Sequence, residues 1–510
     1  MRALRGARGA LDRPRGAGQS GGMLALRPVI YATAKVVVGM AATMVVPMVV
    51  DWSEGNSNWH AFAIVSALTA LVAGLIMTAT RGHERSLTVE QAFLLTTALW
   101  SVCCVVGAIP FMVGAPHVGF TDAIFESMSG LTTTGTTAFP HLDALPPGAN
   151  LWRAILHWLG GLGIVIVAML FLPAMRVGGM QFFRSEGFDT MGKELPRAFD
   201  MAAELTWVYI AMTAACLVAF LISGMSPYDA VFHALSTCST GGFSNHDASF
   251  GAHLRGAQYS ACLFMIGASI PFIRLVQMVH GRPRALWRDP QVRAYLRWIG
   301  IAVVAIILWR WLNEGAPDGF EVLFRESLFN VISTFSGTGF GFGDVSAWGP
   351  FALGVLIVCG LIGGCTGSTG CSIKVFRFLV LKEAVRVQLQ RMSSPHRILP
   401  LRYDGRPLEQ DVLDSVVTFM TLFILCFGLL IVGLSLAGLA PRTALTAAWT
   451  SICNVGPVWG PGTSDNGAID QFPGFAKWLL IAGMFLGRLE LVSVLVLLLP
   501  RFWRSQVVAG

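Results

Sequence analysis

Charged residues are scarce in this chain. Only 13% of its 510 residues are Asp, Glu, Lys or Arg, whereas 54% are hydrophobic, and an ordinary soluble domain has about 25% charged residues. Apolar runs of about 20 residues, the length that crosses about 30 Å of hydrocarbon, recur along the chain. The composition therefore excludes a soluble globular domain and predicts an all-α polytopic membrane protein that lies in the lipid bilayer.

Several motifs of other protein classes are also missing. The ten cysteines contain no Cys-X-X-Cys pair of metal-binding spacing, and most lie in apolar runs, which is typical of small buried residues. The sequence shows no cleavable signal peptide, no dinucleotide or ATP motif, and no clustered catalytic His, Asp or Glu. We therefore expect a protein that is not an enzyme and has no cofactor of its own. The net charge of +7 is explained by loop placement, so we expect no nucleic-acid partner.

Four short polar segments with glycine interrupt the apolar sequence, each after a short predicted helix. They cover residues 132–136, 239–243, 336–340 and 453–457. Glycine tolerates a positive φ, so it allows a backbone carbonyl to turn toward an axis without a Cβ clash. Four such loops around one axis would form rings of carbonyl oxygens that replace a cation's hydration shell. The pattern indicates a cation pathway.

The same arrangement repeats along the chain with a period of about 100 residues. Each unit has a long helix, a short helix, a glycine loop and a second long helix. We expect short helices near 120–131, 228–238, 321–335 and 442–453, and second long helices near 150–175, 255–279, 350–376 and 474–500. The expected domains are a basic tail at 1–28, two helices within 29–87, and repeats at 88–198, 199–296, 297–409 and 410–510.

Charge placement predicts the orientation of these units. Eight Lys or Arg residues lie between 374 and 406, after the third unit, whereas Asp143, Asp247, Asp344 and Asp465 lie on the opposite side. By the positive-inside rule both termini are predicted to be cytoplasmic, with ten full spans and four re-entrant segments that enter from outside. Irregular backbone at membrane depth must be buried or line a wet cavity. We therefore expect four parallel repeats around a pseudo-fourfold pore.

Two further polar features lie at membrane depth. Residues 363–372 are rich in glycine and hydroxyls, which breaks a helix, and Lys374 does not fit the spacing of a phosphate-binding loop; a merely kinked helix is the alternative. Arg488 lies near the middle of the apolar run 478–499, where a charge costs roughly 2.5–3.5 kcal/mol and should face protein or water. Glu490 is two residues away, on another helix face, which makes it a poor partner. A structural ion pair remains the alternative role.

The loops at 128–135, 235–244 and 451–457, with Trp152-Arg153, residues 157–163 and residues 176–181, resemble the TrkH/KtrB/HKT superfamily of cation transporters. The two extra N-terminal helices favour the TrkH branch. The resemblance implies a potassium uptake protein of the bacterial inner membrane that binds K⁺ at the four loops. The residues expected to bind the ion are Thr133, Thr134, Gly135, Ser239, Thr240, Gly241, Gly337, Thr338, Gly339, Asn454, Val455 and Gly456.

The resemblance also implies a gate below these loops. The expected gate residues are Gly363, Gly364, Cys365, Thr366, Gly367, Ser368, Thr369, Gly370 and Arg488; Cys371 and Ser372 depart from the usual glycine-rich end. In the family, glycine at the position of Gly135 accompanies potassium and serine accompanies sodium. The resemblance further implies a homodimer and a cytosolic nucleotide-binding, TrkA-like regulatory subunit near residues 182–184 and 193–197. A sodium-conducting or sodium- or proton-coupled transporter of the same fold is the alternative.

Overall fold

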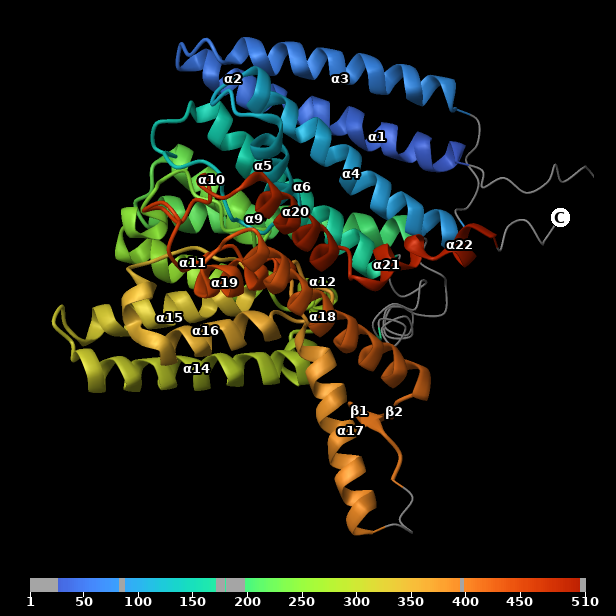
Figure 1. Cartoon of the computed structure of the whole chain (residues 1–510), viewed down its shortest axis with the longest axis vertical. Helices are drawn as coiled ribbons and strands as arrows, with labels where there is room; N and C mark the ends of the chain where they lie inside the picture. The colour runs from blue at the N-terminus through green and yellow to red at the C-terminus, as the bar shows by residue number, and fades with distance from the viewer. Residues whose placement is uncertain (1–25, 82–87, 171–178, 180–197, 395–398, 505–510) are drawn as a thin grey trace, which may run out of the picture.

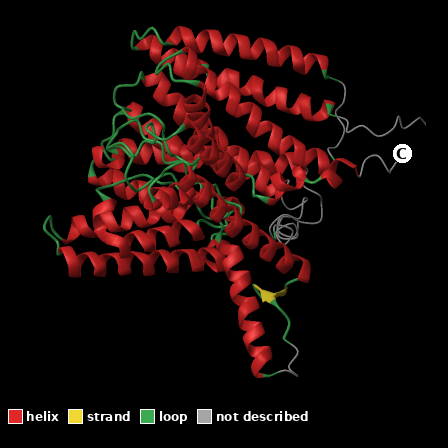
Figure 2. Cartoon of the chain, viewed as in Figure 1, coloured by secondary structure: helices red, strands yellow, loops and turns green. Residues whose placement is uncertain are grey.

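The structure, a computed structural model, describes residues 26–81, 88–170, 179, 198–394 and 399–504 (Figure 1). In this part of the chain almost all regular structure is helical (Figure 2). The exception is a hairpin in which β1 (Arg402–Tyr403) pairs antiparallel with β2 (Arg406–Pro407). Eight described helices are long and apolar enough to cross a membrane, or up to ten if two bent helix pairs each form one span. The protein is therefore an all-α polytopic membrane protein, as the composition predicts.

Three N-terminal elements precede the repeats. Helix α1 (Arg27–Thr43) runs almost directly into α2 (Val45–Ser53), and α3 (Trp59–Ala79) returns beside them (Figure 1). The next helix, α4 (Val89–Val113), begins at a capping box: the Thr88 hydroxyl accepts the Gln91 N–H, and the Gln91 side chain accepts the Thr88 N–H. Such reciprocal capping satisfies two donors at a helix start. Both α1 and α3 pack against α4.

In each repeat a long helix is followed by a shorter one that ends at a glycine loop, and further helices follow that loop. The first has α4, α5 (Phe120–Leu131) and α6 (Pro147–Leu170); the second has α9 (Ala198–Ile222), α10 (Pro227–Cys238), α11 (Arg255–Ala268) and α12 (Phe272–Val279). After α13 (Arg284–Arg288), the third has α14 (Pro290–Glu314), α15 (Phe320–Ser336), α16 (Gly349–Ile362) and α17 (Val375–Ser393). The fourth has α18 (Gln410–Leu436), α19 (Pro441–Cys453), α20 (Gly474–Arg488), α21 (Val492–Leu495) and α22 (Pro500–Arg504). Single 3-10 turns lie at η1 (Ser249–Ala252), η2 (Val345–Trp348) and η3 (Val496–Leu498).

Two helices that the sequence predicts as continuous are sharply bent. The predicted helix 255–279 turns by 100° between α11 and α12, where Pro271 precedes α12 and has no N–H to donate. The predicted helix 474–500 turns by 104° between α20 and α21. Arg488 is therefore the last residue of α20, and its expected position in the middle of a continuous helix is wrong. The break expected at 363–372 is present, between α16 and α17.

The apolar core has two main parts. One joins α1–α6 with the fourth repeat through residues such as Trp152 and Trp449, and the other joins the second and third repeats through residues such as Phe250 and Tyr295. The glycine loops lie where the repeats meet. Helix α17 leaves this body and projects away from it with the β hairpin beside it (Figure 1). The fold thus holds four loops centrally and presents one helical arm outside.

Candidate functional site

The four glycine loops share one backbone pattern. A hydroxyl residue near the end of each short helix (Ser129, Ser236, Ser333 and Thr450, spaced by 107, 97 and 117 residues) has a carbonyl that accepts the backbone N–H five residues later. The donors are Thr134, Gly241, Thr338 and Val455, with N···O distances of 2.9, 2.9, 2.9 and 3.1 Å. These four residues are therefore structurally equivalent. The glycine loops are defined from here on as residues 132–137, 239–244, 336–341 and 453–458.

This pattern corrects the predicted register of the second loop. The glycines with positive φ at the equivalent position are Gly135 (88°), Gly242 (80°), Gly339 (83°) and Gly456 (114°). Gly242, which the sequence prediction omitted, is thus the counterpart of Gly135. Gly241 corresponds instead to Thr134. Ser239 corresponds to Thr132, one position before the first residue expected to bind the ion in loop one. The other three loops keep their predicted register.

Each of these glycines touches the next loop. A Cβ added to Gly135 would overlap the carbonyl oxygen of Gly241, and one added to Gly242 would overlap that of Thr338. Similarly, a Cβ on Gly339 would overlap the oxygen of Val455, and a Cβ on Gly456 would lie 2.8 Å from the oxygen of Thr134. The contacts run from loop one to two, three, four and back to one. The loops therefore surround one axis, with four equivalent carbonyls in a closed ring, which we call the carbonyl ring.

Hydroxyls behind the carbonyl ring hold the returning chain. Ser129, Ser236 and Ser333 donate their hydroxyls to the carbonyls of Thr136, Phe243 and Phe340 at 2.6, 2.8 and 2.8 Å. In loop four the equivalent position is Pro457, and the Thr450 hydroxyl instead accepts the Gly456 N–H at 2.7 Å. Because these donors and acceptors are buried, each bond is costly to lose. Hydrogen bonds from the short helices, on the side away from the axis, thus hold the backbone of each loop in place.

A second polar position, three residues before that hydroxyl, also holds the loops. Glu126 accepts bonds from the Thr137 hydroxyl at 2.9 Å and the Ala138 N–H at 2.8 Å. In the second repeat this position is His233, whose Nε2 lies 3.3 Å from the Ser244 hydroxyl. In the third repeat it is Asn330, which donates to the Phe342 carbonyl at 2.6 Å. The fourth repeat has Ala447 there. His233 therefore has a structural hydrogen-bonding role here.

Two residues of α6 connect α5 to loop two. Arg153, fully buried, pairs with Glu126 at 2.7 Å and donates to the Ser244 carbonyl at 2.8 Å, with its guanidinium 4.1 Å from the Phe243 ring centre. His157 Nδ1 lies 2.7 Å from the Gly130 carbonyl, and Nε2 accepts the Phe243 N–H at 3.1 Å. This pattern requires the neutral tautomer with a proton on Nδ1. Glu126, which lies within the first short helix α5, is therefore held in an ion pair.

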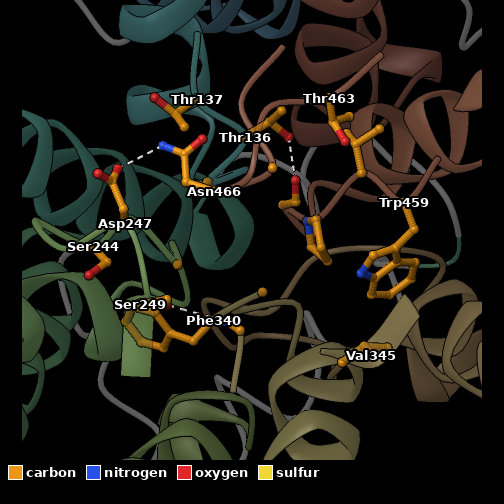
Figure 3. Close-up of a pocket in the computed structure, with 18 of the residues that line it drawn as sticks. Thr136, Thr137, Ser244, Asp247, Ser249, Phe340, Val345, Trp459, Thr463 and Asn466 are labelled. Atoms are coloured by element: carbon orange, nitrogen blue, oxygen red, sulfur yellow. Dashed lines mark hydrogen bonds between the residues drawn. The ribbon is translucent and has the colours of Figure 1, made fainter. Parts of the chain in front are cut away.

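A cavity of about 730 Å³ lies directly above the carbonyl ring. Its lining residues come from all four glycine loops and the segments that follow them, and Figure 3 shows several of them around the cavity. Cross-links join these segments: the Thr136 hydroxyl donates to the Gly456 carbonyl at 2.6 Å, and Asn466 donates to Asp247 at 2.9 Å (Figure 3). The carboxylates of Asp247, Asp344 and Asp465 line the cavity together with Arg153 and Arg442. Hydrated cations can collect in such a cavity before they reach the ring.

An ionic clasp stabilises one wall of this cavity. His246 lies 2.7 Å from Asp143 and 3.2 Å from Asp229, and so joins the segment after loop one to the start of α10. Hydrogen bonding to Asp229 raises the pKa of His246 to about 9. The same contact lowers the pKa of the Asp229 carboxyl. His246 is therefore protonated near neutral pH, and the clasp depends on the positive charge of its imidazolium.

The segment between α16 and α17, residues 363–374, passes below the carbonyl ring and is called the intramembrane loop. Thr369 donates its hydroxyl to the Cys238 carbonyl at 3.3 Å, and Ser372 donates to the Cys453 carbonyl at 3.1 Å. The Thr133 hydroxyl lies 3.9 Å from the Cys371 sulfur. A Cβ on Gly370 would lie 3.2 Å from the Ser336 carbonyl. The loop therefore touches the C-terminal end of every short helix and covers the ring from below.

Arg488 reinforces this cover. Its Nη1 donates to the Thr369 carbonyl at 3.1 Å and contacts the Cys371 sulfur. The side chain is buried, and Nε and Nη2 have no hydrogen-bond partner among the residues that the structure describes. Arg488 contacts the intramembrane loop rather than Glu490, so the sequence interpretation of Glu490 as a poor partner is confirmed. A positive charge with unused donors thus lies beneath the carbonyl ring.

Glu490 instead joins the two helix breaks. Its carboxylate pairs with Lys374 at 2.9 Å and with Arg377, and all three side chains are buried. Lys374 has φ 76° and Glu490 has φ 59°, conformations that cost an ordinary residue roughly 1–2 kcal/mol. The Arg377 guanidinium also stacks 3.7 Å from the Phe419 ring centre. The ion cluster therefore ties the start of α17 to the bend after α20.

Some predicted features lie outside the described residues. Residues 182–184 and 193–197, expected near a docking surface, belong to this group, as does most of 176–181. Within the described ranges no group of three His, Cys, Asp or Glu side chains could hold a metal ion. An ion at the carbonyl ring would be held by backbone oxygens, so it would need no cluster of ligating side chains.

Four parallel loops, a wide cavity above them and a positively charged cover below define a membrane transport protein. The family model described as "TrkH: Cation transport protein" matches residues 58–505. The chain belongs to this family and is a transporter rather than an enzyme.

Curated relatives and a solved structure agree with this assignment. The chain is 38% identical over 480 residues to the Trk system potassium uptake protein TrkI of Halomonas elongata, across 94% of this chain and 97% of that one. It is 32% identical to the Trk system potassium uptake protein TrkH of Escherichia coli, across 92% and 97%. The crystal structure of the potassium transporter TrkH from Vibrio parahaemolyticus superposes with a TM-score of 0.86 at 30% identity, covering 94% of this chain and all of that chain.

Proposed function

We propose that this protein takes up potassium through the centre of the four glycine loops, across a bacterial inner membrane and into the cytoplasm. The observation that carries the proposal is the closed carbonyl ring of Thr134, Gly241, Thr338 and Val455. Carbonyl oxygens around one axis can replace the hydration shell of a dehydrated K⁺. The relatives named above as potassium uptake proteins support the choice of ion.

The short helices add to the attraction for a cation. Helices α5, α10, α15 and α19 all end at the glycine loops. The C-terminal end of a helix carries about half a negative charge, and its effect is strongest within the last turn. Four such ends around one axis favour a cation below the carbonyl ring, where Arg488 and the intramembrane loop now lie.

Selectivity in this proposal rests on backbone geometry at a few positions. Each loop has one equivalent glycine of positive φ and few consecutive carbonyls that face the axis, so few dehydrated ion sites are available. Such a short filter should prefer potassium over sodium with less discrimination than a longer ladder of carbonyls. Gly135, whose added Cβ would overlap the Gly241 carbonyl, holds the position that accompanies potassium in the family.

The intramembrane loop and Arg488 would act as the gate. Residues 363–370 close the path below the ring, and Arg488 adds a positive charge that repels an entering cation. The two unpaired donors of Arg488 make this arrangement costly as it stands, which favours a second arrangement in which they gain partners. Opening would move the loop away from the ends of α10 and α19.

A cytosolic nucleotide-binding subunit and a second copy of the chain are the proposed partners, as the family resemblance implies. Any dependence on a nucleotide would come from that subunit, since this sequence has no nucleotide motif. The projecting arm α17 supports a partner on that side. Its exposed apolar residues Val385, Leu389 and Met392, 57%, 61% and 74% exposed, lie on one face of the helix. Movement of the arm would reach the gate through Arg377 and Glu490.

Growth of a potassium-uptake-deficient bacterium tests the proposal. Expression of the wild-type chain should restore growth at low potassium, and Gly135→Ser should restore it less well and raise sodium sensitivity. Rescue by Gly135→Ser with an unchanged ion preference would refute the assignment of the filter. Failure of the wild type, when it is present in the membrane, would count against potassium uptake and favour the sodium-conducting alternative.

A further inference from the structure

A second cavity, of about 460 Å³, lies far from the ion path, between α1, α3 and α4. It is lined by the first half of α1, the last part of α3 and the middle of α4, and twelve of its fourteen lining residues are hydrophobic. Its rim includes large exposed side chains such as Leu68 (57% exposed) and Val72 (55%). Because these helices lie at the periphery of a membrane protein, the groove opens toward lipid hydrocarbon.

One residue that lines this groove has a buried, unpaired hydroxyl. The Thr33 hydroxyl makes no hydrogen bond with any residue in the described part of the chain. A buried hydroxyl without a partner costs roughly 1–3 kcal/mol, so such groups are usually satisfied by a ligand or water. Thr33 lies six residues, or about 9 Å, from Arg27 along α1. A rotation of the Thr33 side chain about its Cα–Cβ bond would turn the hydroxyl toward the groove, where an oxygen acceptor would complete its bonding.

The end of the groove carries positive charge. Arg27 is the first residue of α1 and lies on the same helical stripe as Ile30 and Ala34, which line the groove. Arg81 follows the end of α3, and Glu90 lies at the same end on α4. Among the described residues at this end, the two arginines outweigh the one carboxylate. Basic side chains at the membrane surface attract anionic lipid headgroups.

We propose that this groove binds one anionic phospholipid. The headgroup phosphate lies against Arg27 and Arg81, a glycerol ester oxygen accepts the Thr33 hydroxyl, and an acyl chain fills the groove along Ala34, Ala73 and Ala98. The binding site would fix α1 and α3 to α4, and through α4 to the first repeat. It is independent of the ion that the protein transports.

Native mass spectrometry tests this with the purified full chain and equal amounts of phosphatidylglycerol and phosphatidylcholine of the same acyl length. The wild type should retain one phosphatidylglycerol. Ala98→Phe fills the groove and should lower that adduct about tenfold, as expected for loss of one or two buried methylene equivalents. The matched control Ala67→Phe adds the same ring to an exposed site on α3 outside the groove and should leave the adduct intact.

The charge variant Arg27→Gln/Arg81→Gln keeps the groove and should reduce the preference for phosphatidylglycerol by about fivefold for each charge. This double variant tests whether the groove selects an anionic lipid even if Ala98→Phe does not fold. Equal binding of both lipids by the wild type, or equal adducts in Ala98→Phe and Ala67→Phe, would overturn the proposal. So would a protein dimer that Ala98→Phe abolishes, because a second copy would then be the occupant.

Discussion

At the scale of single residues, the proposed filter depends on glycines whose Cα hydrogens point at the carbonyl of the next loop. The sequence shows two adjacent glycines in loop two, Gly241 and Gly242, and does not say which one has positive φ. The buried hydroxyl of each short helix resolves this. Alignment on Ser129, Ser236, Ser333 and Thr450 puts Gly242 in register with Gly135. That spacing was present in the sequence, but its structural meaning requires the hydrogen bonds of the folded loop.

The first prediction concerns Gly242. Gly242→Ala should lower rubidium uptake by about tenfold or more, because positive φ alone costs a side chain roughly 1–2 kcal/mol and the new Cβ would overlap the Thr338 carbonyl. Gly341→Ala is the matched control, since its Cβ would meet nothing within 4 Å, and uptake should stay within about twofold. Tracer uptake into vesicles measures both. Equal activities of the two variants would contradict the register.

The second prediction concerns Arg488. A cation about 8 Å from a unit charge meets roughly 2 kcal/mol of repulsion at an effective dielectric constant of 20, which corresponds to about thirtyfold in rate. Arg488→Ala should therefore raise basal ion flux about that much, whereas Arg488→Lys, which keeps the charge, should raise it less. Flux is measured without any partner protein. Unchanged flux in Arg488→Ala would rule out its role in the gate.

At the scale of elements, the sequence predicts the short helices well and the helix breaks unevenly. Amphipathic segments before glycine loops define α5, α10, α15 and α19 to within about two residues. The bend at Pro271 has a local cause, whereas the bend at 489–491 contains neither glycine nor proline. There the buried contacts of Glu490 with Lys374 and Arg377 hold the chain. Those partners lie more than 100 residues away, so no local pattern reveals them.

The third prediction concerns this ion cluster. Glu490→Gln leaves two buried cations without their counter-ion and should lower the free energy of unfolding by roughly 3–5 kcal/mol. The matched control is Glu383→Gln, whose partner Arg386 lies 3.4 Å away with its side chain 65% exposed; it should cost at most about 1 kcal/mol. Thermal unfolding in detergent compares the two. Similar losses in both variants would mean that the cluster does not stabilise the helix break.

The fourth prediction concerns the ionic clasp beside the upper cavity. The folded pKa of His246 is about 9, above its usual value of about 6.5. Its stabilising effect is therefore complete below about pH 6.5 and is lost as the pH rises through about 9. The melting temperature of the wild type should fall between pH 6.5 and 9.5, and that of His246→Gln should fall less. Parallel curves for the two proteins would show that the clasp does not titrate as described.

At the scale of the whole molecule, composition and charge predict the membrane fold, and the repeat period predicts a pathway between four units. The structure adds the order in which the loops meet and the intramembrane loop beneath them. It also shows that the repeats are unequal, since loop four has Asn454, Val455 and Pro457 where other loops have hydroxyls, glycine or phenylalanine. Such asymmetry arises from packing against different neighbours, which a single sequence does not specify.

The most direct test of the central claim is a flux measurement on the purified protein in liposomes. With equal inward gradients of rubidium and sodium, rubidium should enter faster through the wild type. Gly135→Ser should reduce this preference, and His246→Gln should leave it unchanged. Faster entry of sodium, or a preference that Gly135→Ser does not alter, would contradict a potassium pathway through the carbonyl ring.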